Sequence, residues 1–276
     1  MINKTFPIQF DGYEGEATIT TFFYDIVPEI YVKKRPLILV CPGGAYAYRS
    51  ARESESIAFQ FNSFGYHAAI MNYSCAPATY PTQLFEVAAA VKFLKDNHKE
   101  YGIDPGKIVI FGASAGAHAA AMFATGYFNK EVIDALKVKE NYLKPAGMIL
   151  AYPVITSGEF AHRGSFDNLL GKEKGNKELL NLTSIENRVD SHTPAAFIWH
   201  TFADGSVPVE NSLLLANSLK KENVPFELHI FPTGGHGLAM ATEITLSNSK
   251  KELDAGAAQW ISLCKNWLER TIGPLC

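Results

Sequence analysis

Apolar residues in this chain gather in short, nearly continuous runs that alternate with longer amphipathic stretches. Strands that are buried on both faces of a parallel sheet show such near-continuous apolarity. The runs occupy residues 36–41, 67–74, 107–114, 146–154, 195–202 and 226–231. They predict six parallel strands separated by helices, which is an α/β fold with helices on both faces of the sheet.

The residues ahead of these runs alternate more regularly between apolar and polar side chains. Residues 6–10 and 16–25 carry this alternation, and the turn signal Gly12-Tyr13-Glu14-Gly15 lies between them. We therefore expect an antiparallel hairpin at one edge of the sheet, which brings the sheet to about eight strands.

The clearest helical pattern lies in residues 80–102. Its apolar residues recur at the spacing of one helix face: Leu84, Val87, Val91 and Leu94. Pro81 suits the first turn of this helix and Gly102 suits its end. Further helices are expected around residues 53–64, 115–128, 208–222 and 255–270.

A polar, glycine-containing segment, residues 156–193, interrupts the alternation of strands and helices. Insertions of this length are more often functional than accidental. We expect a small cap-like insertion within one domain that spans residues 1–276, since no linker, repeat or low-complexity segment divides the chain.

Charge and composition reduce the range of binding partners and of cellular compartments that we expect for this chain. The formal net charge of -3 is small for 276 residues, which disfavours a nucleic-acid or anionic-membrane partner. The first 20 residues lack the apolar region of a signal peptide, and no apolar stretch reaches the length of a membrane span. The cysteines at positions 41, 75, 264 and 276 are scattered, so we expect no disulfide framework and a reducing, cytoplasmic setting.

The sequence gives no sign of a metal or a cofactor. It contains no H-E-x-x-H or H-x-H spacing, and no glycine-rich loop carries the Lys-Ser/Thr pair of a phosphate cradle. Trp260 and Trp267, in the last expected helix, suit a dimer contact and the core equally, so a homo-oligomer is left open.

One short segment carries the first sign of chemistry. Residues 112–116 read Gly-Ala-Ser-Ala-Gly, which matches the pattern G-x-S-x-G. The pattern alone is weak, but Ser114 follows a buried-type strand directly and precedes a helix directly, as the nucleophile elbow requires. The alternative is a glycine-rich packing turn that contains an incidental serine.

A serine hydroxyl needs a base to take its proton and a carboxylate to orient that base. His236 stands among glycines just beyond the last predicted strand, and Asp204 follows the strand before it. The order Ser114, Asp204, His236 is that of α/β-hydrolases, and all three would lie at the carboxyl edge of the sheet. Asp204 also suits a turn or a helix cap, which Asp-Gly sequences often supply.

Other histidines and acids fit these roles less well. The helix after Ser114 directs His118 away from the serine, and we expect a packed or hydrogen-bonded role for it. His200 and His229 are expected to be satisfied histidines near the core. Asp190 and Asp167 belong to the inserted segment, and either would serve as the acid if Asp204 were misplaced.

Acyl transfer also needs backbone N–H groups that face the developing oxyanion. The residue after the nucleophile, Ala115, supplies one such group. The loop after the strand 36–41 reads Pro-Gly-Gly-Ala, where Gly44 and Ala45 are the expected second donors and a simple Pro-Gly turn is the alternative. Three residues that follow this loop, Tyr46, Tyr48 and Arg49, are expected to line the entrance and bind substrate, although tyrosines covering a helix end are equally common.

With these elements in place, the chain resembles α/β-hydrolase esterases of the carboxylesterase and acetylesterase group. It is most similar to the small bacterial, BD-FAE-type branch of sugar esterases that includes acetyl xylan esterases and feruloyl-type esterases. The resemblance extends from about Leu37 to the end, through "CPGGAY", "FGASAGAH", "HTFADGSVP" and "GGHG". Many relatives have H-G-G-G in the oxyanion loop, whereas this chain has proline in place of the histidine and Ala45 in place of the third glycine.

The resemblance implies a serine carboxylic ester hydrolase with Ser114 as nucleophile, His236 as base and Asp204 as orienting acid. It implies a short-chain acyl ester as substrate, such as an acetyl ester of a sugar or xylo-oligosaccharide, with no cofactor. Three alternatives stay open: a serine peptidase of the prolyl oligopeptidase lineage, a small-molecule thioesterase or formamidase, and an inactive hydrolase fold that only binds.

Overall fold

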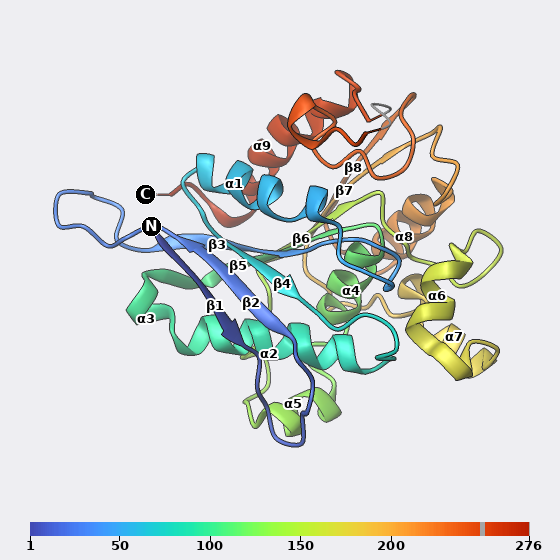
Figure 1. Cartoon of the computed structure of the whole chain (residues 1–276), viewed down its shortest axis with the longest axis horizontal. Helices are drawn as coiled ribbons and strands as arrows, with labels where there is room; N and C mark the ends of the chain where they lie inside the picture. Colours follow the sequence, from blue (N-terminus) through green and yellow to red (C-terminus); the bar gives the residue numbers. More distant parts are fainter. Residues whose placement is uncertain (249–251, 276) are drawn as a thin grey trace.

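A mixed sheet of eight strands runs through the part of the chain that the computed structural model describes, residues 1–248 and 252–275 (Figure 1). The strands are β1 (Ile2–Pro7), β2 (Thr18–Phe23), β3 (Arg35–Cys41), β4 (His67–Asn72), β5 (Ile103–Ala113), β6 (Gly147–Ala151), β7 (Ala196–Thr201) and β8 (Phe226–Phe231). Their spatial order is β1-β2-β4-β3-β5-β6-β7-β8. The pairs from β4 to β8 are parallel, whereas β2 is antiparallel to both β1 and β4. The prediction of a mostly parallel sheet with an antiparallel hairpin at its edge is confirmed.

Several strand boundaries differ from those predicted, most clearly in β1 and β5. β1 begins at Ile2 and ends at Pro7, so Phe10 lies in the connecting loop, where its ring stacks on Tyr13 with the centroids 4.5 Å apart. β5 starts at Ile103, because this residue pairs with Arg35 at the start of β3. The register then shifts, and regular pairing continues from Ile108 opposite Leu37.

Helices cover both faces of the sheet (Figure 1). They are α1 (Glu55–Ser63), α2 (Thr82–Asp96), α3 (His98–Tyr101), α4 (Ala115–Ala124), α5 (Lys130–Leu136), α6 (Arg163–Leu170), α7 (Lys177–Thr183), α8 (Glu210–Lys221) and α9 (Trp260–Ile272). Successive side chains of a strand point to opposite faces. In β3, Ile38 and Val40 therefore pack in the core with α1 and α9, whereas Leu37 and Leu39 pack in the core with α2, α4 and α8. No helix of the described residues is long and apolar enough to cross a membrane.

The helical face predicted in residues 80–102 is buried as expected, since Leu84, Val87, Val91 and Leu94 are at most 4% exposed. The segment forms two helices, however, because α2 ends at Asp96 and the short α3 follows. Gly102 ends α3 in the left-handed region, at φ 64°, which glycine adopts at little cost.

The tryptophans of α9 belong to the core. Trp260 is 1% exposed and stacks on Trp199 of β7 with the ring centroids 5.3 Å apart. Trp267 is also buried and contacts the ring of Phe197 at 5.9 Å. The interpretation of these side chains as a dimer contact is therefore wrong.

The inserted segment after β6 carries α6 and α7, two short helices that the sequence pattern did not predict. It packs on α4, on α8 and on loops at the carboxyl end of the sheet. The backbone N–H of Tyr80 donates to the carbonyl of Leu169, and the side chain of Asn168 donates to the carbonyl of Ala45 at 2.9 Å. The insertion therefore covers the edge where the predicted site residues lie.

Candidate active site

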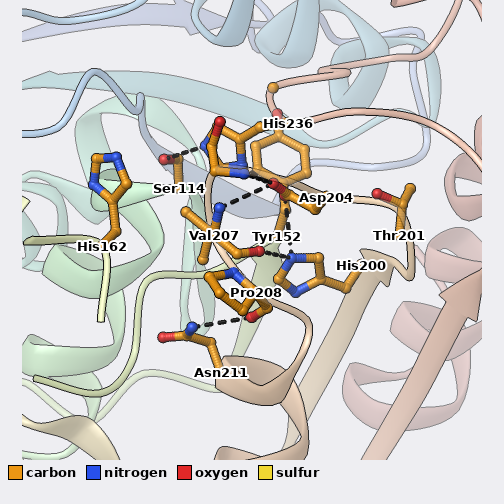
Figure 2. Close-up of polar contacts among 12 residues, drawn as sticks. Ser114, Tyr152, His162, His200, Thr201, Asp204, Val207, Pro208, Asn211 and His236 are labelled. Carbon is orange, nitrogen blue, oxygen red and sulfur yellow. Dashed lines mark hydrogen bonds and ion pairs between the residues drawn. The ribbon is translucent and has the colours of Figure 1, made fainter. Parts of the chain in front are cut away.

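Three loops at the carboxyl end of the sheet bring Ser114, His236 and Asp204 together (Figure 2). Ser114 follows β5, Asp204 follows β7 and His236 follows β8. Ser114 Oγ lies 2.7 Å from His236 Nε2, and His236 Nδ1 lies 2.7 Å from Asp204 Oδ2. The three side chains form one hydrogen-bonded line in which a proton can pass from the hydroxyl to the imidazole.

The turn at Ser114 holds an unusual backbone conformation. Ser114 has φ 54° and ψ -122°, which costs a non-glycine residue about 1–3 kcal/mol. Neighbouring chain segments approach it closely. A Cβ atom at Gly116 would lie 2.1 Å from the carbonyl oxygen of Cys41, and one at Gly112 would lie 2.4 Å from the carbonyl oxygen of Gly116. Glycine is therefore required on both sides of the serine.

Asp204 is buried and fully hydrogen-bonded. Its Oδ1 accepts from the backbone N–H groups of Ser206 and Val207, each at 2.9 Å, while its Oδ2 accepts from His236 and from His200. Burial raises the pKa of Asp204, but the hydrogen bonds from His200 and His236 lower it by more. The pKa of Asp204 therefore lies well below its usual range. The carboxylate stays ionised and can stabilise a protonated His236.

His200 fixes the acid from the side opposite to His236. Its Nε2 lies 3.2 Å from Asp204 Oδ2 and 3.0 Å from the carbonyl oxygen of Val207, and its Nδ1 lies 2.8 Å from the hydroxyl of Ser212. Because Nε2 faces two acceptors, this nitrogen carries the proton. The sequence prediction of a satisfied, buried histidine is confirmed, but its contact with Asp204 was missed.

Free backbone N–H groups surround the serine. Gly44 and Ala45 line the same pocket as Ser114, and Ala115 begins the helix that follows it. In the described part of the chain, the N–H groups of Gly44, Ala45 and Ala115 have no hydrogen-bond acceptor. The neighbouring N–H of Gly43 is occupied, since it donates to Glu53 Oε2 at 2.9 Å.

A buried network joins this glycine loop to the loop that carries His236. Glu53 accepts from Gly43 on one oxygen and from the hydroxyl of Tyr152 on the other, at 2.7 Å. The same hydroxyl accepts from the backbone N–H of Ala239 at 3.0 Å, and the Tyr152 ring packs edge-on against His236 at 5.1 Å. Burial, followed by the Glu53 carboxylate, raises the pKa of Tyr152 well above its usual value. No sequence motif marks Glu53 or Tyr152, and both were missed.

Replacing Tyr152 with phenylalanine tests this network. The substitution keeps the ring against His236 but removes a hydrogen bond to a buried carboxylate, which is worth about 1.5–3 kcal/mol. We expect kcat for p-nitrophenyl acetate to fall about tenfold with little change in KM. Tyr142→Phe is the matched control, because the hydroxyl of Tyr142 also donates to a carboxylate, that of Asp96, far from this pocket. Equal kcat values for the two variants would contradict a positioning role for Tyr152.

The pocket over Ser114 has a volume of about 260 Å³. Most of its lining side chains are polar or charged. The lining consists of Gly44, Ala45, Tyr48, Ser50, Arg52, Glu53, Ser114, His162, Ser206, His236 and Gly237. Arg52 also donates to the carbonyl of Gly237 at 2.8 Å, which fastens the histidine loop to the pocket wall.

Comparison with known proteins identifies the family to which this chain belongs. Residues 25–219 match the family model BD-FAE, which covers well over half of the chain. The chain belongs to the BD-FAE family. The matched range includes Ser114 and Asp204, whereas His236 lies beyond it.

Relatives of this BD-FAE protein include enzymes named for xylan and its esters. It is 35% identical over 245 residues to endo-1,4-beta-xylanase B of Butyrivibrio fibrisolvens, covering 85% of this chain and 38% of that protein. It is 30% identical over 211 residues to the acetylxylan esterase of Xylanibacter ruminicola, covering 74% of this chain and 41% of that protein. The chain thus spans about two fifths of the length of these curated relatives.

A solved structure resembles it over nearly its full length. The acetyl ester-xyloside bifunctional hydrolase from Caldicellulosiruptor lactoaceticus is 36% identical, with a TM-score of 0.81, and the match covers 97% of this chain and 93% of that one. The fold is that of an α/β hydrolase, as the sequence predicted.

Of the three residues expected at the pocket entrance of this BD-FAE protein, only Tyr48 lies there. Tyr48 is 63% exposed and lines the pocket. The expectation for Tyr46 is wrong. Ala45 and Tyr46 both have positive φ angles, which turn the Tyr46 ring into the core, where its hydroxyl lies 2.8 Å from His118 Nδ1.

The expectation for Arg49 is also wrong. Its guanidinium donates to the carbonyl oxygen of Tyr73 at 2.8 Å and approaches Cys75, so it ties the oxyanion loop to the chain after β4 instead of entering the pocket. The hydrogen bond to this carbonyl holds the guanidinium against the chain after β4.

The other histidines and acids that the sequence analysis considered, His118, His200, His229, Asp167 and Asp190, do not line the pocket of this BD-FAE protein. His118 is buried, its Nε2 donates to the carbonyl of Thr183 at 2.7 Å, and burial lowers its pKa to about 4. Asp190 accepts from the backbone N–H of His192, and Asp167 pairs with an exposed lysine. His229 lies 2.8 Å from Glu227. Among the described residues, no group of three or more His, Cys, Asp or Glu could hold a metal ion.

Proposed function

We propose that this BD-FAE protein is a serine esterase that removes short acyl groups, above all acetyl, from sugars or xylo-oligosaccharides. The hydrogen-bonded line from Ser114 through His236 to Asp204, beside free N–H groups, carries the proposal. A serine esterase needs this arrangement, because the serine must lose a proton while the carbonyl oxygen gains negative charge.

The proposed reaction has two acyl-transfer steps. Ser114 Oγ attacks the ester carbonyl carbon while His236 Nε2 takes the hydroxyl proton, and the N–H groups of Gly44, Ala45 and Ala115 hold the oxyanion. His236 then gives the proton to the leaving alcohol oxygen, and the bond from the carbonyl carbon to that oxygen breaks. His236 then takes a proton from water, whose oxygen attacks the carbonyl carbon of the acyl-enzyme. The bond from this carbon to Ser114 Oγ breaks, and His236 returns the proton to Oγ, which releases the acid and regenerates the serine.

Pocket size and lining support a small acyl group on a polar alcohol. A volume of about 260 Å³ is below the roughly 300–1,000 Å³ of pockets that bury drug-sized ligands. The side chains of Ser50, Arg52 and Ser206 line it and suit hydroxyl groups, while the exposed Tyr48 ring at its edge suits the face of a sugar. The names of the xylan-related relatives point the same way.

A cytoplasmic setting is also part of the proposal. The cysteines Cys41, Cys75 and Cys264 are free in the structure, as is usual in reducing compartments. Cys276 lies outside the described residues.

A rate profile over acyl length tests the proposed substrate class. We expect p-nitrophenyl acetate to be hydrolysed faster than the butyrate, and the octanoate about a hundredfold more slowly than the acetate, because overfilling a packed site costs about 1–3 kcal/mol. Acetylated xylo-oligosaccharides assayed alongside should release acetate. An octanoate rate above the acetate rate, or no release from the oligosaccharides, would contradict the proposal.

A further inference from the structure

The inserted segment contributes one histidine to the pocket. His162 caps the start of α6 and lines the same cavity as Ser114 and His236. Figure 2 shows His162 on the other side of Ser114 from His236, and no dashed line joins it to the Ser114–His236–Asp204 line. The proposed mechanism assigns His162 no role, and no sequence motif marked it.

The backbone of α6 fixes which nitrogen of His162 carries a proton. The backbone N–H of Ser165 donates to the carbonyl oxygen of His162 at 3.0 Å and also to His162 Nδ1 at 3.3 Å, and the hydroxyl of Ser165 lies 2.9 Å from Nδ1. A backbone N–H can only donate, so Nδ1 is an acceptor and the proton of the neutral ring is on Nε2. Ser165 is itself buried, so the ring is held from behind.

The proton on Nε2 is available to a ligand. In the described part of the chain, no protein acceptor lies within hydrogen-bonding distance of His162 Nε2. Burial and the neighbouring His236 lower the pKa of His162, against a smaller opposing effect of Asp204, which keeps the ring neutral beside a histidine that becomes charged during catalysis. His162 is thus a single, oriented, uncharged donor in the wall of the pocket.

We propose that His162 is a specificity-determining residue that donates a hydrogen bond from Nε2 to a hydroxyl group of the alcohol half of the ester. This inference rests on the proposed esterase function. The acetyl group of the ester has no hydrogen-bond acceptor besides the carbonyl oxygen, and in the proposed mechanism the N–H groups of Gly44, Ala45 and Ala115 bind that oxygen. A sugar hydroxyl that remains free beside the acetylated position is the acceptor that this donor suits.

The substitution His162→Asn tests the role without removing the cap of α6. Asparagine is a favoured N-cap residue and can accept from the N–H of Ser165, but its side chain is too short to present a donor in the same place. We expect kcat/KM for a mono-acetylated xyloside to fall about tenfold, mainly through KM, which corresponds to one neutral hydrogen bond. The rate with p-nitrophenyl acetate, whose alcohol has no hydroxyl neighbour, should stay within about twofold.

Ser165→Ala is the companion variant, because it keeps His162 and removes only the hydroxyl behind its ring. We expect a smaller loss in the same direction, confined to the sugar ester. Equal losses of His162→Asn on both substrates would show that His162 serves the oxyanion or the fold. Unchanged rates on both substrates would show that His162 makes no contact with the alcohol. Either result would overturn this inference and leave the proposed esterase function standing. A wild-type protein that hydrolyses neither ester would reject the proposed function and this inference with it.

Discussion

Ser114→Ala is expected to lower kcat/KM for p-nitrophenyl acetate by about 10³-fold or more. The substitution removes the oxygen that attacks the carbonyl carbon and the hydrogen bond of 2.7 Å to His236 Nε2. The pocket and its free N–H groups stay in place, so a weak residual rate from bound water is expected. Steady-state kinetics of purified wild type and variant measure the loss.

A matched variant separates lost chemistry from lost structure. Ser262 lies on α9, and its hydroxyl donates to a backbone carbonyl at the exposed surface, that of Gln259. We expect Ser262→Ala to keep the wild-type rate. Thermal unfolding should place Ser114→Ala close to the wild type, because alanine meets the same backbone strain as serine at φ 54°. Equal rates for Ser114→Ala and wild type would exclude Ser114 as the nucleophile.

The sequence was sufficient to predict that Ser114, Asp204 and His236 lie close together, because the order of the strands determines their positions. Each follows a strand whose apolar run was legible, and the carboxyl ends of parallel strands meet at one edge. The prediction needed only the order of elements, not the direction of any side chain. The same reasoning held for the edge hairpin and for both helical layers.

Side chains whose direction depends on the local backbone could not be predicted in this way. Tyr46 was expected at the entrance because it follows the oxyanion loop, but consecutive positive φ angles at Ala45 and Tyr46 send the ring into the core. Nothing in the residue types signals those angles, since neither residue is glycine. Arg49 is held by the backbone carbonyl of Tyr73, a partner 24 residues away that no motif indicates.

The supporting residues were missed because no sequence motif links them to the residues that they contact. Glu53 acts on Gly43 and, through Tyr152, on the loop of His236, and His162 reaches the pocket from the insertion. The helices α6 and α7 are only eight and seven residues long, and they pack on α4 and on loops. Their apolar residues therefore lack the long periodic pattern that revealed α2.

Asp204→Asn is expected to lower kcat for p-nitrophenyl acetate by about 10³- to 10⁴-fold with a small change in KM. Asp204 Oδ2 accepts from His236 Nδ1 at 2.7 Å and from His200 Nε2 at 3.2 Å. Its Oδ1 accepts two backbone N–H groups, so an asparagine would place its oxygen there and its NH₂ group against both histidines. The amide would donate where the carboxylate accepted, which favours the wrong tautomer of His236 and removes the charge that stabilises its protonated form.

The acids of the inserted segment supply the control for this prediction. Asp190 accepts from a backbone N–H and approaches the exposed ring of His192, but it makes no contact with His236. Asp190→Asn should therefore keep the wild-type kcat, since only a carboxylate hydrogen-bonded to His236 can hold its tautomer. A large loss with Asp190→Asn and none with Asp204→Asn would assign the acid to the insertion. The kcat of His200→Leu should fall between those of Asp204→Asn and Asp190→Asn, because leucine has no donor for Asp204 but the carboxylate stays against His236.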